Sequence, residues 1–126
     1  HSFFFEEYSE VFKSFQIVVS KNKRRIIEML QNYFGNDKTI CIWGAGGAGV
    51  AALTLYGIPS SEIKYFIDSD SQKRGKEYLS YSIPIISPEK AKKLKPDLII
   101  IASMYYKSIK KHTRELGIES KIITLP

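Results

Sequence analysis

A glycine-rich stretch directly after a short apolar run constrains the fold of this 126-residue chain more than any other feature. The apolar run covers residues 39–43 and is rich in β-branched side chains, which is typical of a buried strand. Residues 48–56, which follow the glycines, are small and apolar and predict a helix. The stretch between them is Gly44, Ala45, Gly46, Gly47, Ala48 and Gly49.

The rest of the chain continues this alternation of strand and helix. Apolar runs predict strands at 63–67, 97–102 and 121–125, and the proline in the shorter run 83–86 predicts an edge strand or an extended segment. Helices are predicted at 25–34, 88–94 and 105–116, with Ser87 as a cap and Gly35 and Gly117 as stops. Repeated β-α-β order predicts a Rossmann-like α/β fold, with a mostly parallel sheet of about five strands flanked by helices.

The glycine spacing predicts a nucleotide site. The stretch satisfies G-x-G-x-x-G, and Asp68 ends the next predicted strand 19 residues after Gly49, as expected of a dinucleotide-type fold. Gly46 would let the backbone approach a diphosphate, and the free N–H groups of the helix N-terminus would favour an anion. Asp68 would accept hydrogen bonds from ribose hydroxyls, and Lys73 or Arg74 would offset phosphate charge. The alternative is that the glycines only form a tight turn and that Asp68 only caps the next one.

Open parallel sheets bind ligands at the carboxyl ends of their strands, which adds candidates after strand 97–102. Ser103 lies there, and Tyr105 or Tyr106 would either stack on a base or pack as an ordinary helix start. The candidate nucleotide contacts are therefore Gly44, Ala45, Gly46, Gly47, Ala48, Gly49, Asp68, Ser69, Lys73, Ser103 and Tyr105.

An aromatic stripe marks the N-terminal segment. The spacing of its side chains predicts an amphipathic helix over residues 3–20, whose aromatic face must pack on this sheet, on a second copy or on a neighbouring domain. We therefore divide the chain into a docking segment, residues 1–22, and a nucleotide-binding domain, residues 23–126. Contacts to further domains are expected through Phe4, Tyr8, Phe12 and Phe15.

Residue usage excludes several kinds of chemistry. A P-loop would need Gly-Lys-Ser or Gly-Lys-Thr, which does not follow these glycines. Cys41 is the only cysteine and lies in an apolar run, so we expect a buried thiol, with no disulfide and no zinc site. His112 lies on a charged helix, where we expect a solvated side chain rather than a catalytic base. No catalytic residue and no metal ligand is therefore assigned.

Charge and hydropathy limit the partners. A net charge of +6 favours acidic ligands, but the basic residues fall in several separate segments, so nucleic acid is not expected. No apolar stretch approaches the roughly 20 residues of a membrane span. The first residues do not have the pattern of a signal peptide, so the expected location is the cytoplasm.

The order of features from about Lys23 to Pro126 resembles the C-terminal domain of sugar C-methyltransferases, which methylate a nucleotide-linked keto- or deoxysugar. The resemblance implies a Rossmann-like domain that helps to hold the nucleotide-sugar, while S-adenosylmethionine and the reacting sugar belong mainly to preceding domains. Where that family often has a lysine before the last glycine of the turn, this chain has Ala48. The motifs that carry the resemblance are Trp43-Gly44-Ala45 with Gly49, Tyr56-Gly57-Ile58, Tyr65-Phe66-Ile67-Asp68 with Lys73-Arg74-Gly75, Ile83-Pro84-Ile85 with Pro88-Glu89, and residues 122–126.

Three hypotheses follow from the sequence. The first is a non-catalytic domain that binds a dTDP- or UDP-linked sugar as part of a methyltransferase-like or carbohydrate-biosynthetic protein. The second is an NAD(H)-binding module, favoured by the glycine pattern and Asp68. The third is a basic protein-interaction domain. S-adenosylmethionine would be bound only through a domain outside this sequence.

Overall fold

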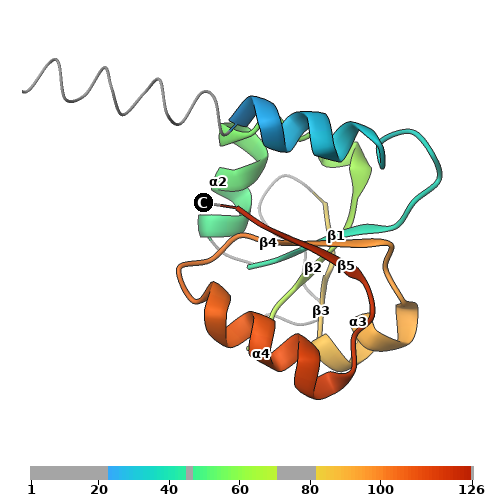
Figure 1. Ribbon diagram of the computed structural model, residues 1–126, viewed down its shortest axis with the longest axis vertical. Helices are drawn as coiled ribbons and strands as arrows, with labels where there is room; N and C mark the ends of the chain where they lie inside the picture. Colours follow the sequence, from blue (N-terminus) through green and yellow to red (C-terminus); the bar gives the residue numbers. More distant parts are fainter. Residues whose placement is uncertain (1–22, 45–46, 71–81, 126) are drawn as a thin grey trace, which may run out of the picture.

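The described residues of the computed structural model are 23–44, 47–70 and 82–125, and they form a five-stranded sheet between two layers of helices (Figure 1). All four strand pairs are parallel, in the order β3-β2-β1-β4-β5. The Rossmann-like fold is therefore confirmed, and so is the edge strand predicted in the run 83–86, where β3 directly follows Pro84. The strands are β1 (Ile40–Trp43), β2 (Ile63–Ile67), β3 (Ile85–Ile86), β4 (Leu98–Ile101) and β5 (Lys121–Thr124).

Helices cover both faces of the sheet. The helix of residues 23–31 and α2 (Gly47–Leu55) lie on one face, and α3 (Pro88–Leu94) and α4 (Tyr106–Leu116) lie on the other (Figure 1). A short 3₁₀ helix, η1 (Ser60–Glu62), precedes β2. As predicted, Ser87 caps α3, because its Oγ accepts a hydrogen bond of 3.0 Å from the backbone N–H of Lys90.

The first of these helices ends earlier than the predicted residue 34. The backbone N–H groups of Tyr33 and Phe34 both donate to the carbonyl of Leu30, at 2.8 and 3.2 Å, and turns then continue to residue 37. Gly35 has a φ of 70°, and its N–H donates to the Glu62 carboxylate at 3.2 Å. The predicted glycine stop is present, but it belongs to this turn rather than to the last turn of the helix.

Alternation along the central strands builds two apolar cores. Ile40 and Ile42 of β1 face the helix of residues 23–31 and α2, whereas Cys41 and Trp43 face α3 and α4. The predicted buried thiol is confirmed, and burial raises the pKa of Cys41 to about 12. Because helices cover both faces of the sheet, the side chains on both faces are buried. The strands are therefore continuous apolar runs in the sequence.

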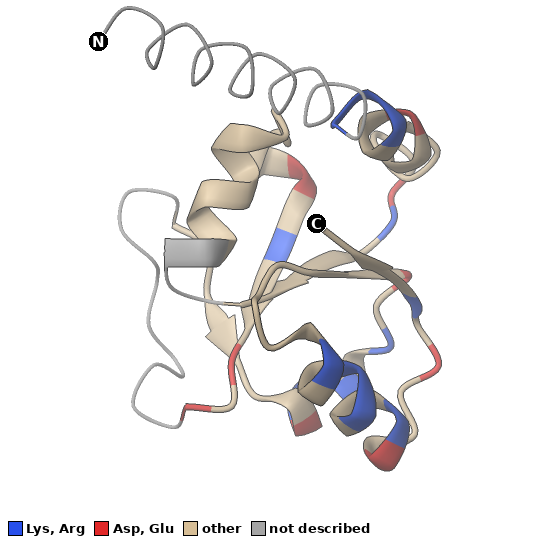
Figure 2. Ribbon diagram, turned by 60° about the vertical axis from the view of Figure 1, so that its left-hand side comes forward, with Lys and Arg blue, Asp and Glu red and all other residues tan. Residues whose placement is uncertain are grey.

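The charges of the two halves of the structure differ. Residues 82–125 contain nine Lys and Arg against four Asp and Glu, whereas the described residues before them contain five of each. Lysines of segments 90–95 and 107–111, which are separate in the sequence, come together on the layer formed by α3 and α4 (Figure 2). These two segments meet because the parallel crossovers place both helices on one face, whereas Lys23, Arg24 and Arg25 lie on the helix that covers the other face.

Besides the predicted contacts at Ala45, Gly46 and Arg74, further sequence-based predictions lie outside the described residues. They are the aromatic helix of residues 3–20, with the domain boundary at 22/23, and the role of Lys73. None of the helices in the described ranges is long and apolar enough to cross a lipid bilayer.

Candidate functional site

The turn from β1 into α2 is built on two glycines that are required by packing. Gly44 has a φ of 135°, and a Cβ there would overlap the carbonyl oxygen of Ala102. A Cβ at Gly49 would overlap the carbonyl oxygen of Gly44 and press on the ring of Phe66. The first and last glycines of the motif therefore let β1 pass close to the end of β4, and let α2 pack closely on β1.

This close approach lies where the connections of the sheet change direction. The chain after β1 enters α2 on one face, and the chain after β4 enters α4 on the opposite face (Figure 1). In open parallel sheets, ligands bind at such a switch point between neighbouring strands. Gly47 and Ala48 lie in the first turn of α2, and Ala45 and Gly46 lie outside the described residues.

A second group of predicted contacts lies at the end of β2. The backbone N–H of Asp68 donates to the carbonyl of Ile86 at 3.0 Å, which extends the pairing of β2 with β3 by one residue. Oδ1 of Asp68 accepts a hydrogen bond of 2.8 Å from the backbone N–H of Asp70, so the carboxylate closes a turn around Ser69. The capping role considered for Asp68 is therefore present.

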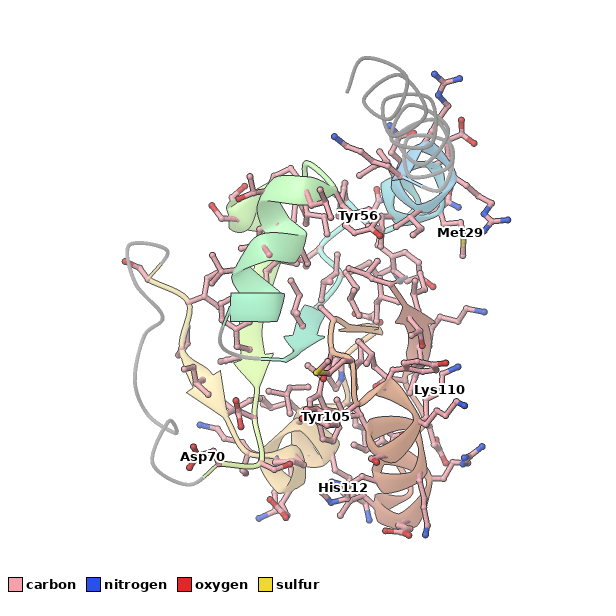
Figure 3. The ribbon with its side chains drawn as sticks, turned by 90° about the vertical axis from the view of Figure 1, so that its left-hand side faces the viewer. Met29, Tyr56, Asp70, Tyr105, Lys110 and His112 are labelled. Carbon is pink, nitrogen blue, oxygen red and sulfur yellow. The ribbon has the colours of Figure 1, made fainter. Side chains whose placement is uncertain are left out.

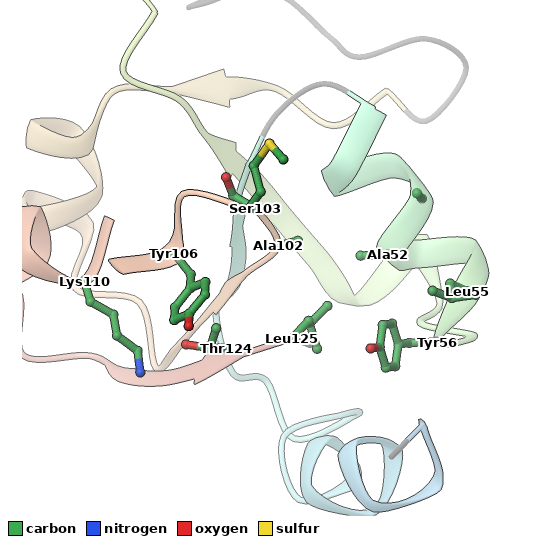
Figure 4. Close-up of a pocket in the computed structure, with 11 residues that line it drawn as sticks. Ala52, Leu55, Tyr56, Ala102, Ser103, Tyr106, Lys110, Thr124 and Leu125 are labelled. Carbon is green, nitrogen blue, oxygen red and sulfur yellow. The ribbon is translucent and has the colours of Figure 1, made fainter. Parts of the chain in front are cut away.

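On the other side of the glycine turn, a pocket of about 620 Å³ opens at the ends of β4 and β5 (Figure 4). Tyr106, Lys110 and Thr124 lie on one side of it, and side chains of α2 lie on the other (Figure 4). The lining residues are Ala51, Ala52, Leu55, Tyr56, Ala102, Ser103, Met104, Tyr106, Lys110, Thr124 and Leu125.

The polar groups of this pocket are few and distinct. The hydroxyl oxygen of Thr124 is buried and has no hydrogen-bond partner among the described residues. Ser103 is partly exposed, and its Oγ accepts a hydrogen bond of 3.0 Å from the backbone N–H of Tyr105. Burial raises the pKa of the Tyr56 phenol above its ordinary value. The pocket is therefore mainly apolar, with hydrogen-bonding groups near the end of β5.

Sequence reasoning identified part of this pocket. Ser103 lines it, whereas Tyr105 is 68% exposed and Tyr106 is the tyrosine that lines it. Lys110 and Thr124 were missed. Tyr106 and Lys110 are four residues apart, which places both on one side of α4, and that spacing was the available signal. Thr124 ends the last strand, at the same sheet edge as Ser103, which sequence reasoning had singled out.

The prediction that the His112 side chain is solvated is only partly correct. The side chain is half-buried, and its ring lies edge-on to the ring of Trp43, with centroids 5.6 Å apart and an interplanar angle of 62°. This contact belongs to the core under α3 and α4, because Trp43 belongs to that cluster. Within the described ranges, no group of three or more His, Cys, Asp and Glu side chains is placed to hold a metal ion.

The parallel sheet, the glycine turn and the switch point together define a Rossmann-like α/β domain. The chain belongs to the family described as the C-methyltransferase C-terminal domain, which matches residues 6–125. This confirms the recognition made from the sequence motifs.

A curated relative agrees with this assignment. C-methyltransferase NovU of Streptomyces niveus is 28% identical over 95 residues, which are 75% of this chain and 23% of that protein. The chain thus spans about a quarter of the length of this relative.

Two solved structures share the fold. UDP-D-quinovosamine 4-dehydrogenase from Vibrio fischeri matches with a TM-score of 0.50 and 24% identity, over 71% of this chain and 78% of that one. RSP, a Rex-family repressor, matches with a TM-score of 0.50 and 16% identity, over 82% of this chain and 68% of that one.

Proposed function

We propose that this domain binds the nucleotide part of a nucleotide-sugar at the carboxyl edge of its sheet, and that it is not catalytic alone. The observation that carries the proposal is Thr124, which lines the pocket beside the glycine turn and whose buried hydroxyl has no partner among the described residues. Buried polar atoms are normally hydrogen-bonded, so an unpaired one in a pocket points to a ligand.

The family supports the proposal. In a C-methyltransferase, the methyl donor and the reacting carbon need a binding site, and this chain spans 23% of its relative NovU. We assign S-adenosylmethionine and methyl transfer to the parts of such a protein outside this sequence. The glycine turn supports the placement of the diphosphate, because it leads into the N-terminus of α2 and the first N–H groups of a helix have no partner within the helix.

A second candidate is the binding of NAD(H). It is favoured by Asp68, which lies at the end of β2, where dinucleotide-binding domains place the acidic residue that binds a ribose. The two candidates share the glycine turn and differ in the ligand that stabilises the domain.

A thermal unfolding experiment with a panel of ligands separates these candidates. A ligand present at about 100 times its dissociation constant adds roughly 2.7 kcal/mol to the free energy of unfolding, which raises the midpoint by several degrees. We expect dTDP- or UDP-sugars to raise it, and S-adenosylmethionine to leave it unchanged. A rise with NAD(H) alone would support the second candidate, and no rise with any nucleotide would contradict both.

The variant Gly46→Val locates the site. A branched side chain at Gly46 would occupy the position where the backbone approaches the diphosphate, so the rise caused by the nucleotide-sugar should be lost. The midpoint of this variant without ligand is the control and should stay near that of the original chain. An undiminished rise would show that the diphosphate does not lie at the glycine turn.

A further inference from the structure

The two ends of the proposed nucleotide site offer opposite kinds of hydrogen-bonding group. At the end of β2, Asp68 and Asp70 are carboxylates, which only accept hydrogen bonds when ionised. At the ends of β4 and β5, the pocket offers the ammonium group of Lys110, which only donates, and the hydroxyl of Thr124. Asp70 and Lys110 lie on opposite sides of the molecule (Figure 3), and β1 with its glycine turn runs between β2 and β4.

The two ends of a nucleotide-sugar differ in the same way. Uracil and thymine are flat, have apolar faces and carry two carbonyl acceptors with one N–H donor between them, whereas a hexose carries several hydroxyl groups that can donate to carboxylates. The pocket has a mainly apolar wall that includes Leu55, Leu125 and the ring of Tyr106, and its volume of about 620 Å³ is sufficient for a nucleoside. Base and pocket are therefore complementary in shape and in hydrogen bonding.

We infer that the pyrimidine base lies in this pocket beside Thr124 and Lys110, with the diphosphate over the glycine turn and the hexose hydroxyls toward Asp68 and Asp70. The inference rests on the proposed function and adds an orientation to it. It also differs from the expectation drawn from dinucleotide-binding domains, because it places the hexose, rather than a ribose, at Asp68.

Lys110 and Thr124 are available for this role. Among the described residues, the only ion pair of α4 joins Lys111 to Glu115 at 3.9 Å, so no carboxylate holds the Lys110 ammonium group. Rotation about the Cα–Cβ bond of Thr124 moves its hydroxyl between staggered positions, and a ligand in the pocket would favour the position that faces it.

Two probes and two variants test the orientation. UMP contains the base and the ribose without a hexose, and UDP-glucose contains the base, the ribose and a hexose. Thr124→Val removes the pocket hydroxyl and should weaken the binding of both probes about fivefold to tenfold, as expected for one lost hydrogen bond. Asp68→Asn keeps Oδ1 for the turn and should weaken the binding of UDP-glucose but not of UMP. Thr54→Val, at an exposed position on α2, is the matched control and should change neither affinity.

Stability provides an independent readout. Since Thr124→Val replaces a buried hydroxyl without a partner by a methyl group of similar shape, its unfolding midpoint without ligand should equal or exceed that of the original chain. Lower affinity together with undiminished stability is the result that we expect.

The other outcomes each overturn a defined part of the account. If Asp68→Asn weakens UMP binding while Thr124→Val does not, the nucleotide lies in the opposite orientation. If both probes bind and neither variant changes the affinities, the inferred contacts are wrong and the proposed function stands. If neither probe binds the original chain, the inference and the proposed function both fail.

Discussion

At the scale of single residues, alanine substitutions at three glycines distinguish the cost of backbone strain from the cost of steric overlap. Gly57 has a φ of 62° with open space around its Cα, Gly49 would suffer overlap without a positive φ, and Gly44 combines both. A left-handed conformation costs a non-glycine residue about 1–2 kcal/mol. We therefore expect Gly57→Ala to lower the free energy of unfolding by about that amount, and Gly44→Ala to lower it substantially more.

Urea unfolding of the three alanine variants measures these differences. Gly49→Ala should also exceed Gly57→Ala, because its Cβ would meet the backbone oxygen of Gly44, and backbone atoms cannot move aside as a flexible side chain can. Equal losses for Gly49→Ala and Gly57→Ala would contradict the close packing of α2 on β1.

Cys41 makes the free energy of unfolding depend on pH in the alkaline range. Burial raises its pKa from an ordinary value of 9.0 to about 12, so between these values the unfolded chain loses the thiol proton and the folded chain keeps it. The unfolded state then binds fewer protons, and the free energy of unfolding falls with rising pH by up to about 1.4 kcal/mol per pH unit. The contribution is fully present below pH 9 and is lost as the pH rises toward 12.

The variant Cys41→Ala isolates this effect. Its unfolding free energy, measured between pH 8 and 11, should fall less steeply than that of the original chain, although the smaller side chain lowers its stability at every pH. Parallel pH profiles would mean that the thiol titrates normally in the folded state.

At the scale of helices and strands, the elements could be predicted because local chemistry determines them. Strand 63–67 and helix 88–94 have the predicted bounds, since their ends carry local signals such as the Ser87 cap. The end of the first helix was misplaced, because Gly35 instead donates to Glu62, a residue that is 27 positions away. A contact of that sequence separation is not visible in a local pattern.

The register of β2 was also not predictable from the sequence. Ile40 pairs with Ile63, but Cys41 pairs with Tyr65, so that Lys64 is an extra residue in β2. The bulge turns Phe66 toward α2, where its ring contacts the space that a Cβ on Gly49 would fill. A local irregularity of one strand thus helps to explain why the last glycine of the motif has to be a glycine.

In the candidate site, too, some residues follow from local sequence patterns and others depend on contacts between segments that are distant in the sequence. The glycine turn, Asp68 and Ser103 could be found from motif spacing and from strand ends. Lys110 and Thr124 were missed, because they join the site only when α4 and β5 fold back beside β4. The spacing of Tyr106 and Lys110 shows that they share one side of α4, but not that this side meets the site. A hydroxyl without a hydrogen-bond partner is likewise a property of the packed structure and not of the sequence.

At the scale of the whole molecule, the layer formed by α3 and α4 competes with the proposed site for phosphate groups. Its excess of Lys and Arg attracts anions without a specific site, and at 0.15 M salt such surface attraction decays over about 8 Å (Figure 2). Binding of a nucleotide is therefore informative only when its position on the molecule is known.

The most direct test is a titration of the isotope-labelled chain with UDP-glucose at physiological salt, followed by the NMR signals of the backbone amides. We predict that the largest shifts occur at residues 44–49, 68–70, 102–106 and 123–125, which surround the carboxyl edge of the sheet. Shifts confined to the exposed lysines of α3 and α4 other than Lys110 would contradict the account, since the nucleotide would then be held by surface charge alone.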